Sequence, residues 1–264
     1  MQWFKVRASS AAPLFTGEDG LTEKQEQRLQ ELLDRLELSK ENPKKALTDN
    51  MQTELLDIQA KKEAEPQLSA GAKSLVEQIV KKHVYGYESV FGGDKKTDKG
   101  NLCEDQTREL HNMIHLTDLH KCEETLSWGI YTGHPDAIDE DNFKIPDFKS
   151  PWSKDSFPVT VEDGRDSTYE WQVKLYLYMK LHMTGDIRWR NGSVFYGLIS
   201  TPEQLLNEWD DEKLHYVDDL DLSLRYTEVP VVLTDHDIKK IDRRGEMALK
   251  HAEQYYNMLM SKNK

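Results

Sequence analysis

The stretch Asn-Phe-Lys-Ile-Pro-Asp-Phe-Lys-Ser at 142–150 limits the possible folds more than any other part of the chain. Its side chains alternate in the way that is typical of a β-strand, in which successive side chains point to opposite faces. In such a strand Ile145, Asp147 and Lys149 share one face, and Phe148 lies on the other. The sequence therefore predicts a strand that holds a carboxylate beside an ammonium group.

A second carboxylate, Asp136, precedes this strand by a short distance in the chain. Residues 126–130 also alternate, and the polar run at 139–142 is typical of a turn. We therefore predict a β-hairpin between 126–130 and 142–150, which would return Asp136 towards Asp147.

Two carboxylates a few ångström apart raise each other's pKa unless a cation lies between them. Oxygen ligands suit Mg²⁺ or Mn²⁺, which bind one or two carboxylates, keep several water molecules and accept phosphate oxygens. An ammonium group beside the ion, such as that of Lys149, would orient an attacking water and offset charge on a phosphorane-like transition state. These residues predict a metal site, with Asp136 and Asp147 as ligands, for phosphodiester hydrolysis.

Five short segments follow one another in an order that is known from nucleases. They are Trp3-x-x-x-Arg7 with Ser9 and Ser10, Gly100-x-x-x-Glu104, Pro135-Asp136, Asp147-Phe148-Lys149, and Gln172-x-x-x-Tyr176. This order resembles the PD-(D/E)xK nuclease superfamily and, within it, the phage-type recombination exonucleases, which are lambda exonuclease-like or YqaJ-like. The resemblance covers residues 1–15 and about 99–180, and it implies an α/β fold with a restriction-endonuclease-like central mixed sheet flanked by helices.

The resemblance also implies a role for each matched residue. Glu104 would be a further metal ligand or would hold the water, Lys149 would activate the water, and Gln172 would position it. Tyr169 and Tyr176 would support this site. A terminal 5′-phosphate would be held by the first segment, through Trp3, Arg7, Ser9 and Ser10. The chain departs from the pattern in three respects: Asp147 stands where Glu is commoner, His134 precedes Pro-Asp, and there is a helical insertion.

The implied function is that of a Mg²⁺-dependent exonuclease, with Mn²⁺ as an alternative ion, that digests linear duplex DNA from the 5′ end in phage-type recombination. Double-stranded DNA ends, a single-strand annealing protein and two further copies of the chain in a homotrimer are the implied partners. Two alternatives stay open: an endonuclease of the same superfamily, and a non-catalytic DNA-binding protein that retains the fold. The intact Asp, Asp-x-Lys and Gln set argues against the second.

Composition and charge limit the size, the location and the mode of DNA binding that this chain can have. The chain has 264 residues, of which 37% are hydrophobic, enough for one sizeable core. It has no signal peptide and no apolar run of membrane-spanning length, so we expect a cytoplasmic protein without membrane contact, in a bacterial host and encoded by a phage or prophage. Its two cysteines indicate neither disulfides nor an iron–sulfur cluster. The net charge of −13 is unusual for a DNA enzyme, so binding would depend on local basic sites such as 188–190, 239–240 and 243–244.

Residues 20–84 predict three amphipathic helices, which we interpret as an insertion packed on the core of a single nuclease domain at 1–264. The first follows a capping box that begins at Thr22, Pro43 interrupts the pattern, and the third follows Ser69. A coiled-coil arm is the alternative, but each helix is too short for sustained heptads.

Other motifs give local predictions. His111 and His115 are spaced i,i+4 and would suit zinc, but no third ligand stands out, so polar residues on a helix surface are the preferred interpretation. Ser167 begins a second capping box, ahead of the helix with Gln172. The pair Asn191-Gly192 predicts a hairpin that joins 187–190 to a strand at 194–199.

Overall fold

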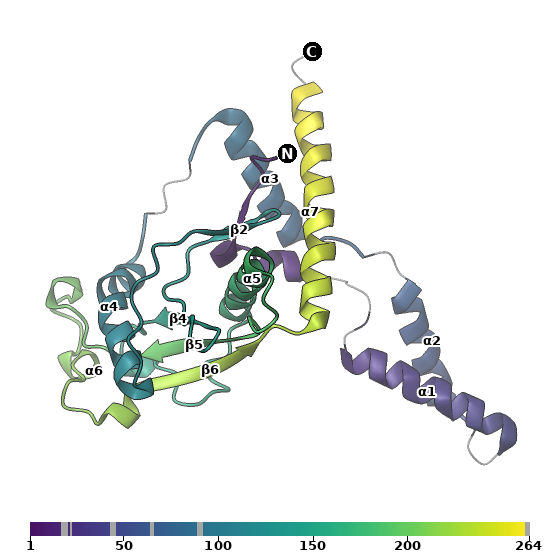
Figure 1. Ribbon diagram of the computed structural model, residues 1–264, viewed down its shortest axis with the longest axis horizontal. Helices are drawn as coiled ribbons and strands as arrows, with labels where there is room; N and C mark the ends of the chain where they lie inside the picture. Colours follow the sequence, from purple (N-terminus) through teal and green to yellow (C-terminus); the bar gives the residue numbers. More distant parts are fainter. Residues whose placement is uncertain (17–20, 22, 43–45, 64–65, 89–91, 262–264) are drawn as a thin grey trace.

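The protein is described by a computed structural model that covers residues 1–16, 21, 23–42, 46–63, 66–88 and 92–261. Its main sheet has the order β4-β5-β6, with β4 (Lys144–Lys149) parallel to β5 (Asn191–Gly197) and β6 (Tyr226–Val232) antiparallel to β5. A small sheet has the order β1-β3-β2, with β1 (Val6–Arg7), β3 (Tyr131–Gly133) and β2 (Leu126–Trp128). Helices flank both sheets, as the predicted α/β fold class requires (Figure 1).

Helix α5 (Ser167–Thr184) lies at the centre of the molecule, because it connects β4 to β5 and packs against both sheets. Its residues 175–180 are all buried, which is expected of a helix covered on every side. The predicted capping residue was wrong by one position: Asp166, not Ser167, is the N-cap, and its side chain accepts a hydrogen bond from the Thr168 amide. Gly185 ends the helix with a φ of +71°.

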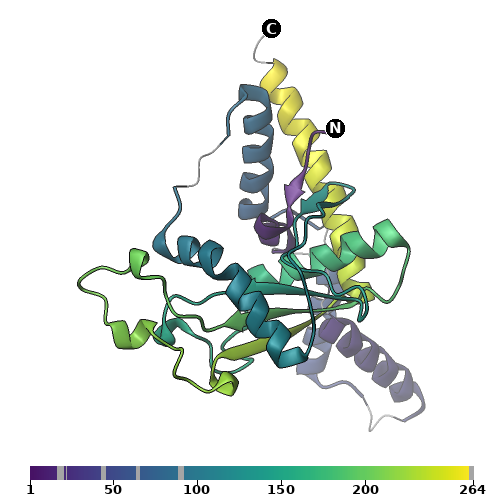
Figure 2. The same cartoon turned by 60° about the vertical axis from the view of Figure 1, so that its left-hand side comes forward.

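Helix α4 (Lys95–His115) packs on β4 and β5 (Figure 2). Asp94 caps its N-terminus by accepting a hydrogen bond from the Thr97 amide. Side chains from α4, β4 and β5 form a hydrophobic cluster there, which includes Cys103, Leu110, Phe148 and Phe195. The cluster fixes α4 on this sheet.

Helices α3 (Ala70–Tyr85) and α7 (Asp235–Ser261) run side by side, next to the N-terminal segment (Figures 1 and 2). Ser69 caps α3, as predicted, by accepting a hydrogen bond from the Ala72 amide. Thr234 and Asp237 form a reciprocal cap at the start of α7, with each side chain accepting from the other's amide. Both helices belong to the main hydrophobic core.

Helices α1 (Glu23–Glu41) and α2 (Asp49–Glu63) form a hairpin that projects from the rest of the molecule (Figure 1). Apolar side chains of the two helices and of the residues just before them pack in a cluster of their own, formed by Leu21, Leu29, Leu32, Leu47, Leu55 and Ile58. The three helices predicted within 20–84 are present, but they do not form one unit, because α3 joins the main core. Thr22 and Pro43, which figured in that prediction, lie outside the described residues.

The remaining elements are short. They are the helix α6 (Glu212–His215) and the 3-10 helices η1 (Ala8–Ser10), η2 (Ala12–Phe15), η4 (Lys154–Ser156), η5 (Glu203–Leu205) and η6 (Leu222–Leu224). Within the described ranges, no helix has the length and apolar character needed to cross a membrane.

Two predicted hairpins are absent from the described chain. Strand β2 pairs with β3 across Gly129, whose φ is +57°, and not with 142–150; the turn at 139–142 is present and is closed by a bridge between Asp139 and Lys144. Asn191 and Gly192 begin β5 itself, in parallel pairing with β4. A Cβ at Gly192 would lie 2.6 Å from the Ile145 carbonyl oxygen, so glycine is required there for strand contact and not for a turn.

Candidate active site

A cavity of about 540 Å³ opens between the first half of α4 and the C-terminal end of β4. Glu104, Asp136, Lys149 and Tyr169, four of the residues singled out in the sequence, line it. Ligand sites of open α/β sheets lie outside the carboxyl ends of their strands, and this cavity is in that position.

Asp147 and Lys149 share one face of β4, as the alternation predicted. The Asp147 side chain is fully buried, and its Oδ2 lies 2.6 Å from Lys149 Nζ. This contact is an ion pair and not a well-aligned hydrogen bond, because Oδ2 has no partner of hydrogen-bond geometry among the described residues. Burial opposes the charge on Lys149, but the carboxylates of Asp147 and Asp136 outweigh it and raise the pKa of the ammonium group. Lys149 Nζ also lies 4.5 Å from the centre of the Tyr169 ring.

Asp136 is held beside β4 by a side-chain hydrogen bond and not by the predicted hairpin. Its Oδ2 accepts a hydrogen bond of 2.7 Å from the Phe148 amide, at the edge of β4 that has no neighbouring strand in the main sheet. The carboxylate thus occupies the place of a strand partner. Burial, and then the nearby charge of Asp147, raise the pKa of Asp136 to about 7.

Gln172 and Tyr176 stand one turn apart on α5 and link the two acidic segments. Gln172 Nε2 donates to Asp147 Oδ1 at 2.9 Å and to the Tyr176 hydroxyl at 3.0 Å. The Tyr176 hydroxyl in turn donates to the His134 carbonyl at 3.1 Å. The Tyr176 ring packs on Gly133, where a Cβ would lie 2.5 Å from it. Gln172 is 7% exposed and, like Asp147, does not line the cavity.

Glu104 faces the cavity from α4, as the resemblance implied. Its Oε1 lies 3.1 Å from Lys121 Nζ, in an ion pair that is partly exposed. Its charge adds a small contribution to the raised pKa of Asp136, after those of burial and Asp147.

Arg7, Ser9 and Ser10 lie at the start of the chain with exposed side chains, at the end of β1 and in η1. Ser10 Oγ donates to the Arg7 carbonyl at 3.1 Å. Burial and then Asp147 raise the pKa of Tyr176, and the Arg7 charge acts in the opposite direction.

Trp3 lies among helices. Its ring stacks on His83 of α3, with centroids 3.7 Å apart and an angle of 6°, and lies 5.8 Å from the Tyr256 ring of α7. Its role at a phosphate stays a prediction.

The basic sites at 188–190 and 243–244 make internal contacts. Arg188 pairs with Asp186 at 2.6 Å and Arg190 with Asp235 at 2.9 Å. Arg244 is fully buried and donates to the Gln67 carbonyl at 2.8 Å. Because these arginine side chains already have protein partners, they are less available to bind DNA than the sequence alone indicates.

Sequence reasoning missed several residues that line the cavity, chiefly Lys96, Asn101, Ser150, Trp152 and Ser156. A signal for some of them exists. Thr97 and Asn101 precede Glu104 by seven and three residues, so they share its helix face and could have been found by helical spacing.

The residues present fit a divalent cation with oxygen ligands. Asp136, Asp147 and Glu104 supply carboxylates, and Asp147 Oδ2 is buried without a directed hydrogen bond in the described structure. Two carboxylates close enough for one to raise the pKa of the other are a site where a cation would be favourable.

Comparison with known proteins gives no match to any family model or to any curated protein. Solved structures do match. A phage-related exonuclease from Haemophilus somnus 129PT superposes with a TM-score of 0.68 at 23% identity, covering 98% of this chain and 96% of that one. The chain has the fold of the phage-type exonucleases. An alkaline exonuclease from Laribacter hongkongensis, LHK-Exo, superposes with a TM-score of 0.57 at 12% identity over 99% of this chain and 97% of that one.

A structure of LHK-Exo in complex with dAMP matches this chain equally well, with a TM-score of 0.57 and 13% identity. The likeness extends over nearly the whole chain, and so includes the parts that the five motifs left uncovered. It confirms the predicted fold class and the resemblance to phage-type exonucleases.

Proposed function

We propose that this protein is a Mg²⁺-dependent exonuclease that hydrolyses phosphodiester bonds of linear duplex DNA from the 5′ end, in phage-type recombination. The observation that carries the proposal is the meeting of Glu104, Asp136 and Lys149 at one cavity, with the buried Asp147 in an ion pair with Lys149, in a chain with an exonuclease fold. The complex of LHK-Exo with dAMP supports a nucleotide substrate for this fold.

Asp136 and Asp147 would hold Mg²⁺ or Mn²⁺, with Glu104 as a further ligand. When bound, the ion would polarise the scissile phosphate and neutralise part of its charge. Lys149 has a raised pKa, so it stays protonated at neutral pH. Its ammonium group can donate a hydrogen bond to the attacking water and offset negative charge as the phosphate is attacked.

Gln172 is a positioning residue in this proposal, because it touches Asp147 and not the cavity. Its amide fixes the rotation of the Asp147 carboxylate, and the Tyr176 hydroxyl fixes the amide. Arg7 with Ser9 and Ser10 would bind the 5′-phosphate of a DNA end, since a guanidinium group and hydroxyls suit that group.

The overall charge of −13 favours an assembly. A monomer would repel DNA over most of its surface, whereas a homotrimeric ring with basic residues turned inward would concentrate positive potential in a channel. The partners proposed are double-stranded DNA ends, further copies of the chain and a single-strand annealing protein.

The test compares linear duplex DNA with covalently closed circles, in Mg²⁺ and in EDTA. We expect digestion of linear DNA alone, and only with the ion. Lys149→Ala should lower kcat by roughly 10²-fold or more, the usual loss when one electrostatic group at a transition state is removed. Lys174→Ala is the matched control, because it removes another Lys–Asp ion pair, 2.9 Å from Asp237, that does not line the cavity.

Each failure has a distinct meaning. Nicking or cutting of closed circles would favour an endonuclease of the same fold. DNA binding by a folded protein without cleavage in Mg²⁺ or Mn²⁺ would favour the non-catalytic alternative. Equal activity of Lys149→Ala and wild type would refute the assigned role of Lys149.

A further inference from the structure

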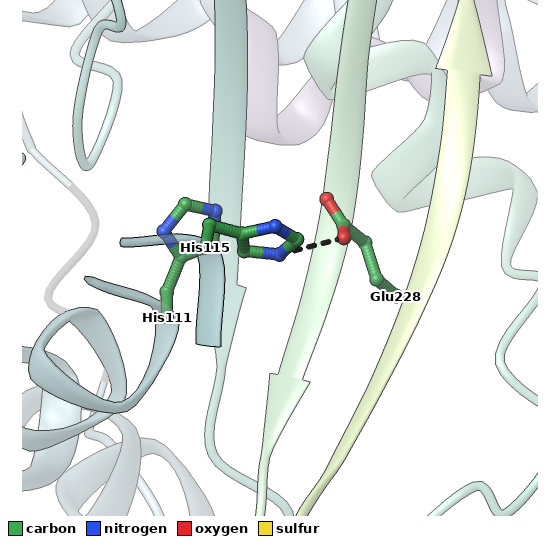
Figure 3. A group of neighbouring side chains, drawn as sticks. All are labelled: His111, His115 and Glu228. Carbon is green, nitrogen blue, oxygen red and sulfur yellow. Dashed lines mark ion pairs between the residues drawn. The ribbon is translucent and has the colours of Figure 1, made fainter. Parts of the chain in front are cut away.

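A second cluster of potential metal ligands lies away from the cavity, between the C-terminal end of α4 and β6. It consists of His111 and His115 of α4 and Glu228 of β6 (Figure 3). One ligand atom from each lies within 4.8 Å of the others. Glu104 is seven residues before His111, or about 10 Å along the helix, so this cluster is separate from the proposed nuclease site.

His115 and Glu228 already face each other. His115 Nε2 lies 2.9 Å from Glu228 Oε2, and the side chains are 36% and 29% exposed (Figure 3). The ligands of a tetrahedral zinc ion lie about 3.3 Å apart, which follows from bonds of about 2.0 Å. The ligand atoms of the three residues lie within 4.8 Å of one another, and the two partly exposed side chains are the ones that can turn towards His111.

His111 is not the helix-surface residue that its sequence indicated. Its side chain is 6% exposed, and its ring lies 5.4 Å from that of Phe148, 5.0 Å from that of Phe195 and 4.4 Å from that of His115. Its Nδ1 is buried without a hydrogen-bond partner among the described residues. Buried polar groups are usually satisfied, so an ordinary core histidine would be expected to have a partner there.

The missing partner also leaves the orientation of the His111 ring open. The χ2 torsion of histidine has two broad minima about half a turn apart, so either ring nitrogen can be turned towards His115 and Glu228. Burial, and then the neighbouring His115, lower the pKa of His111 to about 4, so the imidazole is neutral at physiological pH. Neutral imidazole is the form that binds metals.

The surroundings leave room for an ion and for water. A cavity of about 160 Å³ is lined by all three side chains, together with the polar residues Thr117, Asp139, Asn142 and Ser193 and the basic residue Lys144. A water molecule in the liquid occupies about 30 Å³, so this space admits a hydrated ion.

We propose that His111, His115 and Glu228 bind Zn²⁺, with water in the fourth position, and that the ion fastens α4 to β6. Two imidazoles and one carboxylate suit zinc, whereas Mg²⁺ prefers oxygen ligands alone. The ion would stabilise the helix that carries Glu104 into the nuclease cavity, at a distance from the reacting phosphate. The competing explanation is a simple His115–Glu228 ion pair beside a packed His111.

The test uses the 264-residue protein, stripped with EDTA and dialysed, and needs no DNA. Zn²⁺ is titrated calorimetrically in excess Mg²⁺, which competes for the carboxylate site, and Co²⁺ is added separately as a spectroscopic probe. We expect one zinc per chain and the intense d–d absorption of four-coordinate Co²⁺. At one hundred times Kd, Zn²⁺ should raise Tm by on the order of 5 °C.

Two variants test the ligands. His115→Ala and Glu228→Gln should each weaken zinc binding by at least about tenfold and abolish the intense cobalt bands, since loss of even an outer-shell partner often costs that much. Both side chains are partly exposed, so these variants should fold. His111→Ala is the less informative change, because it opens a space in the core.

The control is Glu77→Gln. It removes another ion pair between histidine and glutamate, His251 Nε2 to Glu77 Oε1 at 3.2 Å, which has no place in this cluster, and it should leave zinc binding unchanged. Zinc affinity equal to wild type in His115→Ala and Glu228→Gln would overturn the proposal, as would the absence of zinc binding to wild type. Zinc binding that is lost in Asp147→Asn instead would assign the ion to the carboxylate site and also overturn it.

Discussion

Replacing Asp136 with asparagine should change how the stability of the protein depends on pH. Burial and Asp147 raise the pKa of this carboxyl group to about 7, against about 3.9 for an aspartic acid in an unfolded chain. Between these values the native state binds more protons than the unfolded state, so stability falls as pH rises. The contribution is fully present below about pH 3.9 and is lost as pH passes through about 7. A shift of about three units corresponds to about 4 kcal/mol, as an upper bound.

The assay is urea or thermal unfolding of wild type and Asp136→Asn in EDTA, at intervals from pH 4 to pH 8. Asparagine keeps an oxygen that can accept from the Phe148 amide, but it carries no charge. The free energy of unfolding of the variant, relative to wild type, should therefore increase by up to about 4 kcal/mol across the range, or roughly 7 °C in Tm. The test is the difference in unfolding free energy between variant and wild type, and not either curve alone. Burial lowers the pKa of His111 to about 4, so in both proteins this group makes stability rise with pH between about pH 4 and 6.5.

Parallel curves for the two proteins would refute the reasoning, since they would mean that the Asp136 carboxyl group has the same proton affinity in the folded and unfolded states. Asp141→Asn is the matched control. It removes a carboxylate from an exposed turn in the same segment, and its curve should follow that of wild type.

Two further predictions concern the DNA end and the assembly. Arg7→Ala should weaken digestion of 5′-phosphorylated ends by roughly tenfold or more relative to 5′-hydroxyl ends, because a charge-assisted contact is lost only where the phosphate exists; an equal loss on both ends would make Arg7 a general backbone contact. Light scattering coupled to size exclusion should give a particle of three chains. A single species at the 30.7 kDa mass of one chain that still digests long DNA would exclude the ring.

Short-range periodicity located the strand and the helix of the candidate site well, and physical reasons explain why. A period of two fixes which side chains of β4 share a face, so Asp147 and Lys149 were paired correctly. A spacing of four residues on a helix likewise brings Gln172 and Tyr176 together. Such relations depend on the local backbone alone.

Strand pairing does not depend on the local backbone alone, and the hairpin predicted between 126–130 and 142–150 was wrong. Residues 126–130 alternate, but alternation cannot say which strand is the partner, and β2 pairs with β3 instead of β4. Asp136 still arrives beside Asp147, through a side-chain contact with the Phe148 amide that no pattern records. The correct neighbours were thus predicted with the wrong hairpin.

The histidine pair shows the same limit. The i,i+4 spacing of His111 and His115 was visible, but the burial of His111 and the third neighbour of the pair were not. Glu228 comes from β6, the last strand of the main sheet, and only the antiparallel pairing of β5 and β6 brings it next to α4. A ligand set assembled from distant segments is recognisable once the fold is known.

The three carboxylates in and beside the candidate cavity are each balanced in a different way, and this predicts how Mg²⁺ binding should depend on pH. Lys149 lies beside Asp147, Lys121 pairs with Glu104, and a proton can neutralise Asp136, whose pKa is raised to about 7. Metal ligands must be deprotonated, so Mg²⁺ competes with this proton. As pH increases towards about 7, the apparent affinity for Mg²⁺ should therefore rise by up to tenfold per pH unit. Above about pH 7 the affinity should become independent of pH. Nuclease activity at limiting Mg²⁺ should follow the same curve and should lose its dependence on pH when Mg²⁺ is saturating. A pH dependence that is unchanged by Mg²⁺ concentration would mean that the proton in question does not belong to a metal ligand.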